Sequence, residues 1–434
     1  MPVTSRRIAG LVVLLAVLAA VGAIVWVFVL VWNEESPIEP VPSPVASPMV
    51  SPVTTPEQTV AATPMPTRSV VPTVVPGSLP DLLRYAPDRL ANNSLPLSDI
   101  ARYADIAGWM TARDISVPSD ALPVTGDTWE RELDALAMPE VVHARGNDPS
   151  WRSTYGFSLV DVDQLLAVGQ APDFVMIMRG DFDPDVLHAA WVQSGYQAVR
   201  TNGYTIWSLF PGDAVDLSAP ASRPALGNMN NVVLLDDGTL IATSRLSRME
   251  ETLRVVRGEA SSLGQNPAIA SLMAPGAGAE QLVSAMIVRG TVLASAPSTP
   301  VPTVPAGTVG VDATFATPEM LVPMPVADLV LAGIAAPVQA EAIPVMSLIV
   351  SYDSVDDATR AMARVDHALR ADVSPVTGDP YTDRMQPLGT RVVNADEGAV
   401  LLVEARPLAG ADDWQAILDE RDLGFLAWPW NEGQ

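Results

Sequence analysis

The sequence of 434 residues contains no cysteine and no lysine. Without cysteine, disulfide bonds, thiolate nucleophiles and cysteine-ligated metals are excluded, so a folded domain of this chain depends on its core alone. Without lysine, Schiff-base enzymes, the Ser-x-x-Lys acylases and the lysine of phosphate-binding loops are excluded too. All 25 basic residues are arginines. This arginine-only, Ala/Val/Pro-rich composition is typical of a protein from a GC-rich bacterial genome.

Positive charge is scarce relative to negative charge. Asp and Glu total 50 against 25 basic residues, which gives a net charge of −25 at pH 7. Two of the arginines, Arg6 and Arg7, precede the first long apolar run, so the rest of the chain is still more acidic. An acidic surface repels nucleic acid and anionic lipid headgroups. Nucleic acid is therefore not an expected partner, and a soluble acidic exterior is the simplest interpretation.

Charge is absent from one long run, residues 8–32. These 25 residues include no charged or amide side chain, and as a helix they would extend about 37 Å across a hydrocarbon core of about 30 Å. The run predicts a transmembrane helix, anchored in its outer half by Trp26 and Trp32. A cleaved signal peptide is the alternative. It is disfavoured because nine more residues of the run follow Ala23, where cleavage would occur.

The charges that flank this run predict its orientation. Arg6 and Arg7 precede it, Glu34 and Glu35 follow it, and the next basic residue is Arg68. The positive-inside rule then places residues 1–7 in the cytoplasm as a short tip. The arginine pair also resembles the start of a twin-arginine export signal, although topology alone explains it. The expected localisation is the cell membrane, single-pass, with the remaining chain extracytoplasmic and the lipid bilayer contacted through residues 8–32.

Composition divides the rest of the chain into segments. Residues 33–80 contain twelve prolines among Ser, Thr and Val, which predicts a disordered linker or an extended stalk. Residues 297–325 repeat this composition and are either an interdomain linker or an exposed loop within one domain. The patterns elsewhere predict a mostly helical section at 81–172 and two α+β units, at 173–296 and 326–434.

The helical section is predicted from capping residues and apolar spacing. Four helices are expected, at 81–90, 98–113, 127–138 and 161–168. In the second, Ser98 is the N-cap and apolar residues recur at helical spacing. In the third, Asp127 and Glu130 form the two ends of a capping box, and Pro139 ends the helix.

The order strand, capped helix, hairpin and helix occurs twice after residue 173. The first series is a strand at 174–179, a helix from Asp183 to about 194, hairpins over Asn202-Gly203 and Asp237-Gly238, and a helix at 245–256. The second is a strand at 345–352, a helix opened by Ser354 and Asp357, a hairpin at 391–404 and a helix from Asp412. Further strands are expected at 285–291 and 328–335. We interpret the two series as ferredoxin-like α+β units, with duplication as their origin, so the predicted fold class is α+β.

Three aspartates have the spacing with which a calcium loop begins. They are Asp181, Asp183 and Asp185, but Val186 and Val192 stand where such a loop needs a glycine and a bidentate carboxylate. Carboxylates also stabilise a first helical turn, so we expect capping rather than metal binding. The adhesion tripeptide Arg-Gly-Asp at 179–181 is interpreted as a turn.

The remaining candidates carry little specific chemistry. His143, His188 and His367 have no partner at metal-ligand spacing, and no nucleophile elbow supports a Ser-His-Asp site. The pair Trp428 and Trp430 is either a sugar-stacking platform or, as their area favours, a tail packed on a core. No catalytic, cofactor-binding or metal-binding residue is therefore assigned, and no cofactor is expected.

These features favour a non-enzymatic surface or envelope module that binds or scaffolds something outside the membrane. One alternative is a cell-envelope hydrolase whose carboxylates come together only in space. Another is an accessory subunit of a membrane complex, because the tip at 1–7 is too short to fold into an effector. Beyond the bilayer, the expected partner is an envelope or membrane protein.

Overall fold

A computed structural model describes the chain from residue 75 to residue 419, apart from residues 89–98, 119–127, 171–172, 275, 290–328, 341, 375–376, 396–397, 409 and 412. The described residues belong to one compact unit, Val71–Gln434. The predicted span at 8–32, the predicted tip, the segment 297–325 and the tryptophans at 428 and 430 lie outside the described residues. Within them, no helix combines the length and the apolar character needed to cross a bilayer.

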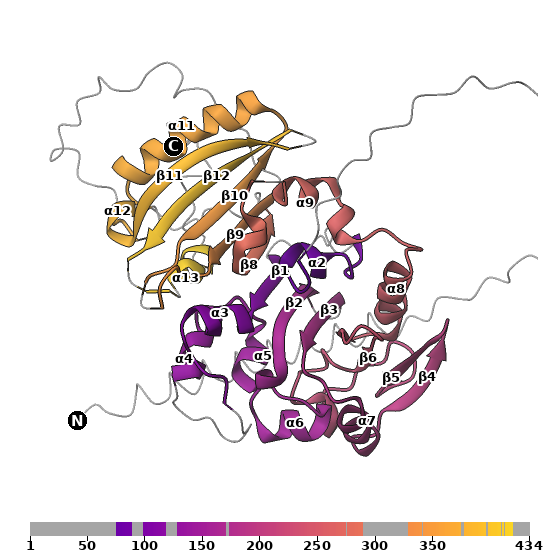
Figure 1. The fold of residues 1–434 in the computed structure, drawn as a ribbon. Coiled ribbons are helices and arrows are strands. Elements are labelled where there is room, and N and C mark those ends of the chain that lie inside the picture. The colour runs from indigo at the N-terminus through magenta and orange to yellow at the C-terminus, as the bar shows by residue number, and fades with distance from the viewer. Residues whose placement is uncertain are drawn as a thin grey trace, which may run out of the picture. The chain divides into compact units, whose positions relative to one another are not determined.

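Twelve strands of the described residues form one sheet, in which every neighbouring pair is antiparallel (Figure 1). Their spatial order is β11-β12-β10-β9-β8-β1-β2-β3-β7-β6-β5-β4. The strands are β1 Asp99–Asp105, β2 Val162–Gln170, β3 Asp173–Gly180, β4 Gln197–Thr201, β5 Tyr204–Ser208, β6 Asn231–Leu234, β7 Leu240–Thr243, β8 Leu282–Arg289, β9 Leu329–Ala335, β10 Met346–Tyr352, β11 Met385–Asn394 and β12 Ala399–Pro407. The predicted α+β class is confirmed.

Helices cover both faces of this sheet. On one face the core includes side chains of α3 Ile106–Ala112, α4 Thr128–Leu133, α5 Glu140–Arg145, α6 Pro149–Tyr155, α7 Pro184–Gln193, α11 Val355–Ala371, α12 Tyr381–Arg384 and α13 Asp413–Asp419. On the other face it includes side chains of α2 Leu79–Leu83, α8 Leu246–Val256 and α9 Pro267–Leu272. Figure 1 shows α11 lying along β10, β11 and β12.

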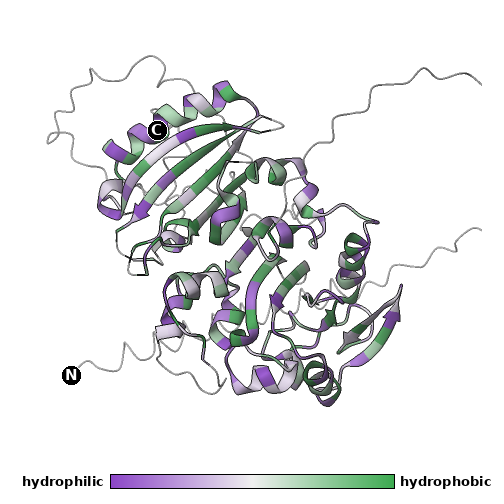
Figure 2. Ribbon diagram, in the orientation of Figure 1, coloured by the Kyte–Doolittle hydropathy of each residue, from purple (hydrophilic) through white to green (hydrophobic). Residues whose placement is uncertain are grey.

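The inner strands are apolar on both faces because helices cover both. In β10, Leu348 and Val350 belong to one core and Ile349 to the other, and all three are fully buried. Figure 2 shows the hydrophobic colouring along the inner strands. Such strands lack the apolar–polar alternation by which a half-buried strand is recognised.

This two-sided burial explains two wrong predictions. The helix predicted at 98–113 is β1 followed by the shorter α3, whose N-cap is Asp105 rather than Ser98; the Asp105 side chain accepts a hydrogen bond from Gly108 N at 3.0 Å. The helix predicted at 161–168 is β2. Both strands lie in the middle of the sheet, where strand pairing overrides local helical spacing.

The other helices of the first section are shorter than predicted. The helix predicted at 81–90 is α2, which ends at Leu83, and it begins at Leu79, inside the predicted linker 33–80. The helix predicted at 127–138 is α4, which ends at Leu133. Pro139, which was expected to end this helix, instead occupies the N-cap position of α5. Neither α5 nor α6 was predicted.

The strands and helices that were predicted after residue 173 are present, whereas α9 and α12 were not predicted. Asp183 caps α7, and Ser354 caps α11 by accepting a hydrogen bond from Asp357 N. Asn202 and Gly203 both have positive φ, as a two-residue hairpin turn requires. The hairpin β11–β12 is longer than predicted, because β11 begins at Met385.

The sheet contains the same strand order twice. The first series is β1, β2, β3, α7, β6 and β7, with the hairpin β4–β5 inserted after α7. The second is β8, β9, β10, α11, β11 and β12, and in both series the last strand lies between the third strand and the fourth. Helices α7 and α11 pack on the same face. The first strands of the two series, β1 and β8, form an antiparallel pair at the centre of the sheet. A two-fold rotation about this pair would therefore relate the strand order of one series to that of the other.

The segment 290–328 connects two neighbouring strands. Arg289 at the end of β8 pairs with Leu329 at the start of β9. The strands that flank this segment are therefore neighbours in one sheet, while 297–325 itself lies outside the described residues. The predicted strands 285–291 and 328–335 correspond to β8 and β9.

Gly333 lies where the backbones of β8 and β9 leave no room for a side chain. A Cβ at this position would lie 2.3 Å from Ser284 O and 3.1 Å from Ala285 Cα, both backbone atoms. We expect Gly333→Ala to lower the free energy of unfolding by about 1–3 kcal/mol or more, because the two backbones would have to separate. Chemical denaturation tests this. Gly389→Ala in β11 is the matched control, since nothing lies within 4 Å of its Cβ position; equal effects of both variants would contradict the steric account.

Candidate functional site

Asp81 is a buried carboxylate with three cationic or backbone partners. It is the third residue of α2, and its residue exposure is 2%. One oxygen contacts Arg84 Nε at 3.1 Å; the other accepts a hydrogen bond from Gly77 N at 2.9 Å and lies 3.4 Å from Arg179 Nη2. Buried carboxylates are stable only when paired in this way. Asp81 therefore holds the start of the folded unit against the end of β3.

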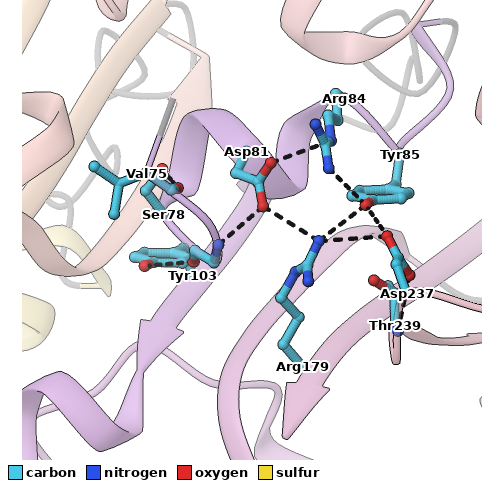
Figure 3. A network of polar contacts seen from close by, with 10 residues as sticks. Val75, Ser78, Asp81, Arg84, Tyr85, Tyr103, Arg179, Asp237 and Thr239 are labelled. Carbon is cyan, nitrogen blue, oxygen red and sulfur yellow. Dashed lines mark hydrogen bonds and ion pairs between the residues drawn. The ribbon is translucent and has the colours of Figure 1, made fainter. Parts of the chain in front are cut away.

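Arg179 extends this pairing to the turn between β6 and β7. Its Nη2 lies 3.5 Å from Asp237 Oδ2 and donates a hydrogen bond of 2.9 Å to the Tyr85 hydroxyl. That hydroxyl donates in turn to Asp237 Oδ2 at 2.6 Å and accepts from Arg84 Nη2 at 2.8 Å. Figure 3 shows Arg179 between the two carboxylates, with the Tyr85 ring beside it. We call Asp81, Arg84, Tyr85, Arg179 and Asp237 the Asp81 network.

The network holds Asp237 in its charged form. Partial burial alone would raise the pKa of Asp237, but hydrogen bonds from Tyr85 and Thr239, together with the charge of Arg179, outweigh it and lower the pKa below its ordinary value of 3.8. A carboxyl group whose folded pKa is depressed stabilises the fold above its unfolded pKa. That stabilisation is lost as the pH falls through the folded pKa.

This pairing predicts a pH dependence below about pH 4. As the pH falls, the unfolding free energy of the unaltered chain should fall more steeply than that of Asp237→Asn, so that the difference between the two shrinks. Denaturant titrations at a series of pH values measure it. A difference that stays constant from pH 6 to pH 2 would show that the Asp237 charge does not contribute.

A pocket of about 790 Å³ opens beside the network. Five separate segments form it: the end of α2, Tyr204 of β5, the β6–β7 turn, the end of α8 and the loop at 258–262 with Gln265. Its lining residues are Arg84, Tyr85, Tyr204, Leu235, Asp236, Asp237, Val255, Val256, Gly258, Glu259, Ala260, Ser261, Ser262 and Gln265. We call it the Tyr204 pocket. Its volume lies within the roughly 300–1,000 Å³ typical of small-molecule sites.

Glu259 and Asp237, two carboxylates of the pocket, are not suited to act as general acids. Glu259 accepts two hydrogen bonds from Arg257, of 2.7 and 2.6 Å, and these lower its pKa. The pKa of Asp237 is lowered too. Glycoside hydrolysis needs one carboxyl group whose pKa is raised so that it carries a proton at neutral pH. Glu259 and Asp237 therefore lack the raised pKa that this general acid requires.

The aspartates that resemble a calcium loop serve as a helix cap. Asp183 Oδ1 accepts hydrogen bonds from Asp185 N at 2.9 Å and Val186 N at 3.3 Å, which confirms the capping interpretation. Among the described residues, no group of His, Asp or Glu has the arrangement of a metal site. Asp181 and Asp185 are exposed.

The adhesion tripeptide does not form a free turn. Arg179 and Gly180 belong to β3, and the Arg179 side chain, 19% exposed, is held by Asp81 and Asp237. Gly180 pairs with Val162, and its Cβ position would lie 2.0 Å from Asp161 O. The arginine that an adhesion receptor would need is therefore part of the Asp81 network.

The three histidines lie in separate places. His143 contacts Asp134, Nε2 to Oδ1, at 3.0 Å on the surface. His188 stands on α7 with its ring 5.5 Å from those of Trp191 and Trp207. His367 lies on α11. The structure does not bring them together.

Comparison of the chain with protein-family models, with curated proteins and with solved structures gives no match. The assignment of function therefore rests on the residues themselves. No motif in the sequence indicates the chemistry of the pocket. The one relevant signal was the Asp237-Gly238 turn, which gave the position of Asp237 along the chain and no information about its partners.

Proposed function

We propose that this protein is a membrane-anchored, extracytoplasmic binding module without catalytic activity of its own. The uncharged run at 8–32, with Arg6 and Arg7 before it, supports the anchor and its orientation. The observation that carries the binding role is the Tyr204 pocket, in which five segments present polar and aromatic groups. Because Asp81, Arg179 and Asp237 are ion-paired next to it, the pocket has a preformed wall.

The anchor is tested with reporter fusions to the full chain. Alkaline phosphatase fused after residue 434 should be active, because it folds only outside the cytoplasm, whereas β-galactosidase at the same position should be inactive. The mature protein should keep residues 1–32 and resist carbonate extraction of membranes. Cleavage near Ala23 and release into the soluble fraction would contradict the anchor. The positive charge can be moved to the other side of the run by the four substitutions Arg6→Glu, Arg7→Glu, Glu34→Arg and Glu35→Arg. This variant should give a weaker phosphatase signal, because the flank with more positive charge stays in the cytoplasm.

The absence of turnover is tested on the same purified chain. Incubation with polymeric envelope material, followed by analysis of released products, should show no cleavage above that of a denatured sample. Cleavage abolished by Asp236→Asn or Glu259→Gln would replace the proposal with the hydrolase alternative. Isolation of the chain in a stable complex with one integral membrane protein would favour an accessory subunit.

We also infer that the repeated strand order represents two ferredoxin-like units that arose by duplication. In each, the third strand, its helix and the fourth strand form a split β-α-β arrangement, because the last strand lies between them. The predicted unit boundaries, 173–296 and 326–434, would then move. The first unit would gain β1 and β2 as its first two strands, and the second unit would gain β8 as its first strand.

A further inference from the structure

We propose that the Tyr204 pocket binds a neutral, hydroxyl-rich ligand of the glycan class. This inference deepens the proposed function and rests on it, because it names the ligand of the same pocket. It starts from the charges around the pocket. Most of them are already paired with each other.

Three arginines and four carboxylates stand at or next to the pocket. Arg84 and Arg179 pair with Asp81, Arg179 also pairs with Asp237, and Arg257 pairs with Glu259. The remaining carboxylate, Asp236, is exposed, and no residue in the described part of the chain contacts it by hydrogen bond or ion pair. Asp236 is therefore the carboxylate of the pocket that has no arginine partner among the described residues.

This balance argues against charged ligands. An anion would meet the Asp236 carboxylate and a chain of net charge −25. An organic cation would find only Asp236, because the other carboxylates already have arginine partners. A wholly apolar ligand would remove water from Arg84, Asp236 and Glu259 without replacing its hydrogen bonds, which is costly.

The polar groups that remain include both donors and acceptors. The Arg84 side chain is 56% exposed and uses Nε and Nη2 within the network, which leaves Nη1 as a donor. Gln265 accepts a hydrogen bond from Ser262 N through Oε1, which leaves its amide nitrogen as a donor. Asp236 is an acceptor. A hydroxyl group donates and accepts at once, so a polyhydroxylated ligand satisfies both kinds of group.

Apolar contacts are available for the carbon face of such a ligand. Tyr204 and Val256 line the pocket and are partly buried, and Leu235 and Val255 also line it and are buried. An aromatic ring beside polar groups offers an apolar face and a polar edge to the same ligand. Polar recognition and ring contact together are what a sugar ring requires.

The test is binding of neutral oligosaccharides to the full chain. Maltotriose, cellotriose, mannotriose and chitotriose would be titrated by calorimetry and by saturation-transfer NMR, in a detergent without a sugar headgroup. Agmatine and citrate are the cationic and anionic controls. We expect at least one trisaccharide to bind at least tenfold more tightly than agmatine and citrate.

Variants locate the binding in the pocket. Asp236→Ala and Tyr204→Ala should each weaken trisaccharide binding by about fivefold or more, the size expected for one lost hydrogen-bonding or ring partner. Tyr204→Phe keeps the ring and should restore most of the affinity. Asp181→Ala, at an exposed carboxylate outside the pocket, is the matched control and should have no effect.

The outcomes separate this inference from the proposed function. If no trisaccharide binds, or if agmatine binds more tightly and depends on Asp236, the ligand class is wrong while the anchor and the lack of turnover stand. If a trisaccharide binds and is cleaved in the same NMR sample, the ligand class stands and the non-catalytic role is overturned. Binding that the pocket variants do not change would overturn the site.

Discussion

Trp414→Ala should lower the free energy of unfolding by about 3–5 kcal/mol, the cost of removing a fully buried tryptophan. Trp414 lies on α13 with an exposure of 0%. Its Nε1 donates a hydrogen bond of 3.0 Å to Ala135 O, so the last described helix of the second series is fastened to the segment after α4. Denaturant unfolding of the full chain, followed by circular dichroism, measures the change.

Two variants on the same helix separate the contributions to this effect. Trp414→Phe keeps most of the ring volume but loses the hydrogen bond, so we expect a loss of about 1–2 kcal/mol. Gln415→Ala removes an exposed hydrogen bond of 2.9 Å to Asp134 O and should cost about 1 kcal/mol or less. If Trp414→Ala costs no more than Gln415→Ala, α13 is not part of the core.

Asp81→Asn should be the most damaging change in the polar network, with a loss of about 3–5 kcal/mol. The substitution keeps the shape of the side chain but removes the charge that faces Arg179, whose side chain is 19% exposed. Arg179 then retains only Asp237, at 3.5 Å, as a charged partner. The measurement is again denaturant unfolding, at pH 7.

Arg84 provides the control for this prediction. It pairs with the same carboxylate but is 56% exposed, so Arg84→Gln should cost only about 0–1 kcal/mol. In the double variant Asp81→Asn with Arg179→Met, the charge of Arg179 is no longer left without Asp81, so part of the loss should be recovered. The recovery is incomplete because Asp237, whose side chain is 45% exposed, also loses its arginine partner. A double variant that loses the full sum of the single effects would show that Asp81 and Arg179 are not coupled.

Elements that begin with a strong local signal could be predicted from the sequence. Asp183 and Ser354 cap their helices with their own side chains, and the Asn202-Gly203 turn adopts the positive φ angles that only a few residue types tolerate. In these places a few adjacent residues decide the local conformation. The position of the element is therefore contained in a short stretch of sequence.

The strands β1 and β2 could not be predicted in this way. Tyr103 in β1 and Leu166 in β2 pair with each other across the sheet, and both strands contribute side chains to the cores on both faces. Their apolar pattern carries no period of two. The Asp81 network was invisible for the same reason, because Asp81, Arg179 and Asp237 lie far apart in the chain and meet only when the sheet has formed.

The central pairing of β1 with β8 has a consequence for synthesis of the chain. Tyr103 and Ser284, which contact across this pair, are 181 residues apart. A chain made from its N-terminus at about 5–20 residues per second therefore leaves one edge of β1 unpaired for roughly 10–40 s. An exposed edge of a hydrophobic strand invites pairing with other chains. Productive folding of this protein thus depends on keeping nascent chains apart until β8 has emerged.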